Sequence, residues 1–147
     1  MVYIKFGVVL ALFSMVLIGC KESSSSTPLT TTLDISGHAT GGFISNGDVK
    51  VYDFSNDVRG DVLGAGLTND YGVFSVQVDG VNAQDGQYIM ICVESGSYTE
   101  AASGVNVQLA EGDELCAIKF LNQNAKFSVV INPWSHYASA LTQYLLT

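Results

Sequence analysis

Hydrophobic and polar residues alternate with a period of two over most of the chain between Leu33 and Ile131. The clearest run, residues 74–79, alternates phenylalanine and two valines with serine, glutamine and aspartate. Successive side chains of a β-strand point to opposite faces, so each run of this kind predicts a strand with one buried face. The pattern predicts seven or eight short strands, within residues 33–38, 49–52, 63–67, 74–79, 88–93, 105–109, 116–120 and 127–131.

Clusters of glycine, asparagine and aspartate separate most of these runs. Such residues accept the backbone geometry of tight turns and commonly connect short strands. The clusters are Asn46-Gly47-Asp48, Asn69-Asp70-Tyr71-Gly72, Asp85-Gly86 and Glu111-Gly112-Asp113. Strands with one apolar face each favour two sheets packed over a shared core. We therefore predict an all-β fold for residues 33–132, an antiparallel, Ig-like β-sandwich followed by a short C-terminal α-helix.

The period changes at Asn132-Pro133, which is typical of a helix start because asparagine caps the helix and proline fits its first position. Over residues 133–147, apolar side chains then recur at helical spacing and form one face. These are Trp134, Tyr137, Ala138, Leu141 and Leu145. We expect this face to cover an end of the sandwich. The alternative is that Trp134, Tyr137 and Leu141 are exposed and mediate self-association, as expected for a shortened relative of a longer repeat protein.

Three segments of the predicted domain carry short motifs: Ile35-Ser36-Gly37, residues 47–53, and residues 67–76, where Asn69-Asp70-Tyr71-Gly72 leads into Phe74. Over residues 33–109 the chain thereby resembles the carboxypeptidase-regulatory-like, transthyretin-like domains. Those domains often show aspartate at the position of Asn69, where this chain departs from the pattern. The resemblance implies a transthyretin-like β-sandwich with a spacer or adhesion role, and it carries over no catalytic residue.

The first twenty residues have the features of an export signal. Lys5 precedes an almost wholly apolar run, residues 6–18, which is too short to span a bilayer as a helix. The run ends in Leu17-Ile18-Gly19-Cys20, which resembles the bacterial lipobox. That resemblance implies removal of residues 1–19, a diacylglycerol on the Cys20 sulfur, and acylation of the new amino group with a fatty acid such as palmitate.

By the same resemblance, Lys21 in place of aspartate after the lipidated cysteine favours the outer membrane over the inner one. Residues 20–32 are then rich in serine and threonine and low in complexity, which predicts a flexible tether between the lipid and the domain. The alternative is that the first strand already starts within residues 30–32, since threonine favours strands.

Composition limits the function further. The 147 residues contain 6 Lys and Arg against 14 Asp and Glu, a net charge of −8, which argues against a nucleic-acid partner. Asp34, Ser36 and His38 would lie in parallel along one strand and cannot converge as a hydrolytic triad does. No P-loop, G-x-S-x-G, H-E-x-x-H or C-x-x-C motif occurs. We therefore expect no catalysis, no cofactor and no bound metal.

Cys92 and Cys116 remain once Cys20 carries lipid, and an exported pair favours a disulfide. The alternation of apolar and polar residues in the two strands raises a difficulty for this bond. Cys116 alternates in step with Ile118 and Phe120, so it would lie on the same, inward face of its strand. Cys92 lies between Ile91 and Val93, so it would lie on the opposite, outward face of its strand. A β-bulge, or a different inward face of the first of the two strands, would restore the bond, and the alternative is two separate buried thiols.

Together these features predict a lipid-anchored, non-catalytic structural or interaction module of the bacterial cell envelope, with an envelope protein or glycan as partner. The alternative is a surface binding module for a peptide or glycan, with Tyr52, Tyr71 and Tyr98 as ligand contacts. Arg59-Gly60-Asp61 is the integrin-type tripeptide, but three-residue matches often arise by chance.

Overall fold

The computed structural model describes residues 31–81, 86–121 and 127–146. The predicted signal, Cys20 and most of the predicted tether lie outside these residues. The described chain contains nine strands and one helix: β1 (Thr31–Ala39), β2 (Asp48–Asp53), β3 (Val62–Leu67), β4 (Val73–Val81), β5 (Gln87–Val93), β6 (Ser97–Thr99), β7 (Asn106–Gln108), β8 (Leu115–Leu121), β9 (Phe127–Ile131) and α1 (Pro133–Leu146). Because β1 begins at Thr31, the last two residues of the predicted tether belong to a strand.

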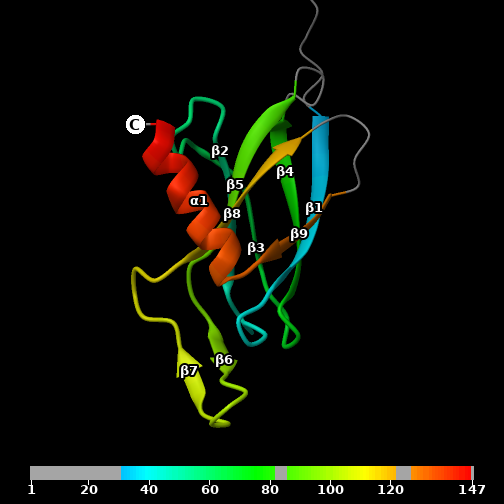
Figure 1. The fold of residues 1–147 in the computed structure, drawn as a ribbon. Helices are drawn as coiled ribbons and strands as arrows, with labels where there is room; N and C mark the ends of the chain where they lie inside the picture. The colour runs from blue at the N-terminus through cyan, green and yellow to red at the C-terminus, as the bar shows by residue number, and fades with distance from the viewer. Residues whose placement is uncertain (1–30, 82–85, 122–126, 147) are drawn as a thin grey trace, which may run out of the picture.

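The strands form a three-stranded sheet in the order β4-β1-β9, a four-stranded sheet in the order β3-β2-β5-β8, and the separate β6-β7 hairpin (Figure 1). A mainly β, mainly antiparallel chain with a C-terminal helix is thus confirmed. The predicted strand number was too low, because β6 has only three residues, too few for a period of two to be recognised. The prediction of purely antiparallel pairing was wrong for β9, which runs parallel to β1. Since β9 follows a strand of the other sheet, no hairpin fixes its direction relative to β1.

One hydrophobic cluster joins the inward faces of the three- and four-stranded sheets. In β4, Phe74, Val76 and Val78 are buried while the alternating polar residues are exposed, as the period of two predicts. Each fully buried side chain of this size contributes roughly 1.5–3 kcal/mol relative to exposure. The cluster's buried members are Ile35, Ala39, Ile44, Val49, Val51, Phe74, Val76, Val78, Ile89, Ile91, Val93, Ala117, Leu121, Val129 and Ile131.

The four-stranded sheet is also covered on part of its outer face. There a second cluster contains Tyr52, Phe54, Met90, Cys92 and Cys116, and β5 is consequently buried from Ile89 to Val93 without interruption. Burial on both faces removes the alternation that would orient such a strand.

The expected inward face of β8 was wrong. Ala117 and Leu121 belong to the central core, whereas Cys116 and Ile118 belong to the outer cluster. Residues on both faces of this strand are partly apolar, because its outer face lies beneath other segments of the chain. The alternation in the sequence therefore indicated the wrong face as the inward one.

Helix α1 starts as predicted. The Asn132 side-chain oxygen accepts a hydrogen bond from the Ser135 backbone N–H at 2.8 Å, and Pro133 is the first helical residue. The helix lies against β8, on the outer side of the four-stranded sheet, and does not close an end of the sheets (Figure 1).

The helix presents a different face to the sheet from the one expected. Ser139 is buried, and the Ser135 hydroxyl donates a hydrogen bond to the Cys116 carbonyl at 2.9 Å. Trp134 is 81% exposed, Tyr137 66% and Leu141 44%, so the expectation that this stripe covers the sheets was wrong. Small serines let the helix approach β8 closely, and this leaves the larger apolar side chains on the opposite side. Within the described residues, no helix has the length and apolarity needed to cross a membrane.

Candidate functional site

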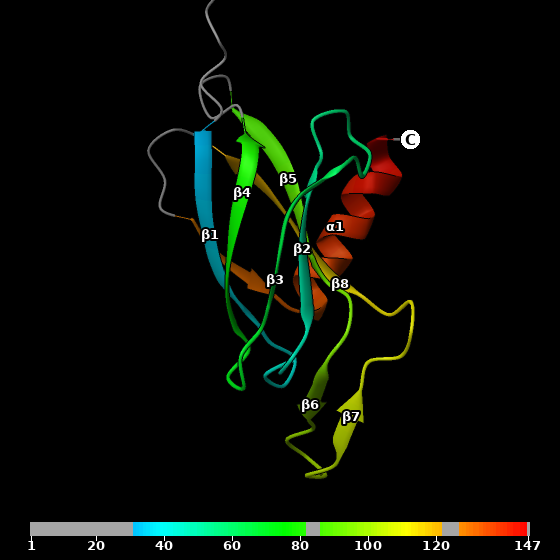
Figure 2. The same ribbon diagram turned by 180° about the vertical axis from the view of Figure 1, so that it is seen from behind.

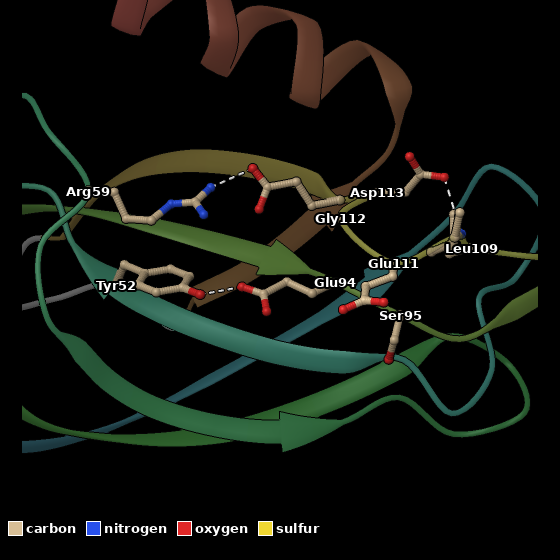
Figure 3. Close-up of a pocket in the computed structure, with 10 residues that line it drawn as sticks. Tyr52, Arg59, Glu94, Ser95, Leu109, Glu111, Gly112 and Asp113 are labelled. Atoms are coloured by element: carbon tan, nitrogen blue, oxygen red, sulfur yellow. Dashed lines mark hydrogen bonds and ion pairs between the residues drawn. The ribbon is translucent and has the colours of Figure 1, made fainter.

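A cleft of about 690 Å³ lies on the outer face of the four-stranded sheet. Figure 3 shows the Tyr52 side chain directed toward Glu94, with Arg59 beside Tyr52. Tyr52 comes from β2, Glu94 follows β5, and Arg59 lies in the connection between β2 and β3. The segment before β8 supplies the remaining wall, which includes Glu111, Asp113 and Glu114.

The connection that carries Arg59 is shaped by Asp53, the last residue of β2. The Asp53 carboxylate accepts hydrogen bonds from the Ser55 backbone N–H at 3.1 Å and from the Gln87 amide at 2.8 Å. The Asp53 carbonyl accepts a further bond from the Gly60 N–H at 2.9 Å, which closes the loop. These bonds return the chain over the sheet and position Arg59 above it.

Arg59 is the chain's single arginine, and its guanidinium lies close to Glu114, Tyr52 and the sulfurs of Cys92 and Cys116. Nη2 donates to the Glu114 carboxylate at 2.6 Å and lies 3.5 Å from the Cys92 sulfur. The guanidinium carbon lies 4.8 Å from the centre of the Tyr52 ring, a cation–π arrangement. Arg59 therefore ties the β2–β3 connection to both β2 and the segment before β8.

Glu94 is the second centre of the cleft. Its carboxylate accepts hydrogen bonds from the Lys50 ammonium and the Tyr52 hydroxyl, both of which project from β2 (Figure 3 shows the bond to Tyr52). Lys50 and Tyr52 are two residues apart on the strand, so their side chains share its outer face.

The pKa shifts in the cleft all favour the ionisation state present at neutral pH. Partial burial alone would raise the pKa of Glu94, but hydrogen bonds from Lys50 and Tyr52 and the nearby positive charges lower it. The hydrogen bond to Glu94 raises the pKa of Lys50, and burial together with the same carboxylate raises the pKa of Tyr52. The hydrogen bond to Glu114 raises the pKa of Arg59. None of these shifts brings a group closer to neutral pH, where a general acid or base works best.

The lowered pKa of Glu94 predicts a loss of stability in acid. Its contribution is fully present above the usual pKa of 4.5 and is lost as the pH falls through the lower pKa of the folded state. Between about pH 6 and about pH 3, we expect the melting temperature of the wild-type chain to fall by roughly 2–4 °C more than that of Glu94→Gln. Thermal melts followed by circular dichroism measure this, and equal slopes in the two proteins would contradict it.

Cys92 and Cys116 are directly opposite one another on neighbouring strands and form a disulfide, with their Cα atoms 4.1 Å apart. Both are buried, and their sulfurs lie 3.5 Å and 3.7 Å from Nη2 of Arg59. Among the described residues, Cys92, Cys116 and Glu114 form one cluster of potential metal ligands. The disulfide leaves no thiolate there, so this cluster cannot hold a metal through its sulfurs while the bond is intact.

The three tyrosines predicted as ligand contacts occupy different environments. Tyr52 lines the cleft and is hydrogen-bonded to Glu94. Tyr98 lies in β6 and is half-buried against the core, whereas Tyr71 is 69% exposed in the connection between β3 and β4. The structure thus gathers only Tyr52 with other polar groups of the cleft.

Sequence reasoning did not identify Arg59, Glu94 or Glu114 as partners. In the sequence Arg59 stands out only as part of a tripeptide, and no local pattern connects it to a glutamate 55 residues later. The only feature of the sequence that could have pointed to a role for Arg59 is that it is the single arginine of an acidic chain. With its guanidinium bonded to Glu114, Arg59 is already engaged within the molecule.

Comparisons of the chain with protein-family models, with curated proteins and with solved structures found no match.

Proposed function

We propose that the chain is a lipid-anchored, non-catalytic module of the bacterial cell envelope, whose body is a transthyretin-like or Ig-like β-sandwich. The observation that carries this proposal is Leu17-Ile18-Gly19-Cys20 at the end of an apolar run that Lys5 precedes. Acylation of Cys20 with two or more chains would give a stable anchor, since one chain holds a protein to a bilayer only weakly.

The arrangement of the cleft supports a structural or interaction role. Its cations bond to its carboxylates, in the pairs Arg59 with Glu114 and Lys50 with Glu94. A nucleophile activated by a neighbouring base would instead need a base with its pKa near neutral pH. In our proposal the Arg59–Glu114 pair holds the β2–β3 connection in place over the sheet, and the Lys50–Glu94 pair joins β2 to the residue that follows β5. The partner of the module is an envelope protein or a glycan.

Replacing the cysteine of the motif tests the anchor. In bacterial cells given labelled palmitate, we expect the wild-type chain to incorporate label and to partition into the detergent phase. Cys20→Ser should lose both properties almost completely, because serine offers no sulfur for the diacylglycerol. The matched control, Cys92→Ser with Cys116→Ser, should retain label and partition as the wild type does. Label that persists in Cys20→Ser would contradict the proposal.

A further inference from the structure

We propose that the exposed face of helix α1, made of Trp134, Tyr137, Leu141, Tyr144 and Leu145, rests on the surface of the phospholipid bilayer that holds the lipid anchor. This inference rests on the proposed lipidation of Cys20. It assigns to the helix a second, non-covalent contact with the same membrane.

The composition of this helix face is typical of the membrane interface. Trp134, Tyr144 and Leu145 are 81%, 78% and 71% exposed, on the side turned away from the buried Ser139. Tryptophan and tyrosine combine an apolar ring with a polar group and are enriched where hydrocarbon meets headgroups. Leucines between them add apolar surface that water solvates poorly.

Charge is absent from this part of the chain. Residues 127–147 contain no Asp, Glu, Lys or Arg, although the whole chain has a net charge of −8. An acidic partner surface would be repelled by the body of the domain, and a basic one would find no carboxylate on the helix. An uncharged face therefore fits the apolar boundary of a bilayer better than it fits a charged protein surface.

The position of the helix brings this face near the anchor. Cys20 precedes β1 by a segment that spans at most about 40 Å when fully extended. The start of β1 and the last turn of α1 lie at the same end of the molecule, as Figures 1 and 2 both show. The β6-β7 hairpin lies at the opposite end. The helix is about 21 Å long, so all of its exposed face lies within reach of a bilayer to which Cys20 is attached.

Trp134 is the chain's only tryptophan, and its fluorescence therefore reports on this face alone. The test uses the membrane-extracted chain, with its mass determined, reconstituted into vesicles of phosphatidylcholine with or without bromine on the acyl chains. Bromine quenches tryptophan only at close range. We expect brominated vesicles to lower Trp134 emission by roughly half, because an interfacial helix buries its apolar face to about 5–10 Å depth.

Two paired variants make the result specific. Leu141→Ser with Leu145→Ser removes apolar surface from the helix face and should abolish most of the quenching. Leu67→Ser with Val105→Ser removes exposed apolar side chains from β3 and from the segment just before β7. This control pair should leave the quenching of Trp134 unchanged. Loss of quenching in both pairs, or in neither, would contradict the assignment.

The remaining outcomes separate the two proposals. An acylated chain whose Trp134 is not quenched overturns the inference and leaves the anchor intact. A blue-shifted Trp134 that bromine does not quench, together with a dimeric mass in detergent, overturns it in favour of a second copy of the chain on this face. A chain without lipid by mass contradicts the proposed function and removes the attachment on which the inference rests.

Discussion

Replacing Gly37 with alanine is expected to lower the free energy of unfolding by about 3 kcal/mol, with a fall in melting temperature of about 10 °C. Gly37 lies in β1, the central strand of its sheet, and pairs with Phe74 on one side and Val129 on the other. A Cβ at this position would lie 2.3 Å from the Val129 carbonyl oxygen and 2.5 Å from the Phe74 ring.

Neither neighbour of Gly37 can move cheaply. The Val129 oxygen belongs to a backbone held in the sheet, and the Phe74 ring is buried in the central core. The added methyl must therefore displace a strand or a core aromatic, and overpacking of this kind is among the more costly substitutions.

Gly41→Ala is the matched control. Its new Cβ would meet Pro133 at 3.4 Å, which is ordinary contact, so the change should stay within about 0.5 kcal/mol. Chemical denaturation of both variants measures the two effects. A Gly37→Ala protein as stable as Gly41→Ala would contradict the described packing of β1 between β4 and β9.

Loss of the disulfide is expected to have the second large effect, about 3 kcal/mol, because the bond closes a loop of moderate length and restricts the unfolded chain. Cys92 and Cys116 are separated by 24 residues in the sequence. Both are buried in the outer cluster, and alanine preserves most of that apolar environment. Cys92→Ala with Cys116→Ala should therefore weaken the fold chiefly through the lost cross-link.

Reduction provides the control for this prediction. A reducing agent should lower the stability of the wild-type chain to that of the double alanine variant and should leave the variant itself unchanged. Denaturation curves with and without reductant provide the comparison. Wild-type stability that does not respond to reductant, with both thiols shown by labelling to be free, would contradict the expected contribution of the bond.

The strands that the sequence predicted well are those with water on one face. In β4, alternation alone identified Phe74, Val76 and Val78 as core residues, because the opposite face of that strand is exposed. In β8, the outer face is partly covered, so Cys116 and Ile118 are as apolar as the inward Ala117. Alternation cannot orient a strand that is covered on both sides.

The start of helix α1 was predictable, but the face that it buries was not. Asn132 and Pro133 define the start through local chemistry, which needs no knowledge of the rest of the molecule. The choice of buried face depends on how closely the helix approaches β8, and the serines Ser135 and Ser139 permit that approach. An apolar stripe therefore indicated a helix correctly but did not indicate its contact surface.

The polar cleft could not have been assembled from the sequence, because its pairs are distant along the chain. Glu94 meets Lys50 across 44 residues, and Arg59 meets Glu114 across 55. Such pairs depend on strand register and on the path of the β2–β3 connection. Tyr52 alone was singled out beforehand, as a ligand contact, and the structure places it in hydrogen-bonding contact with Glu94.

We propose that Cys20 becomes the acylated first residue of the mature chain, and the mass of the N-terminal peptide of that chain tests this most directly. We expect the N-terminal peptide of the membrane-bound protein to begin at Cys20 and to carry the mass of a diacylglycerol, together with an acyl group on the amine. A peptide that continues upstream of Cys20, or one that begins at Cys20 with an unmodified thiol, would contradict it.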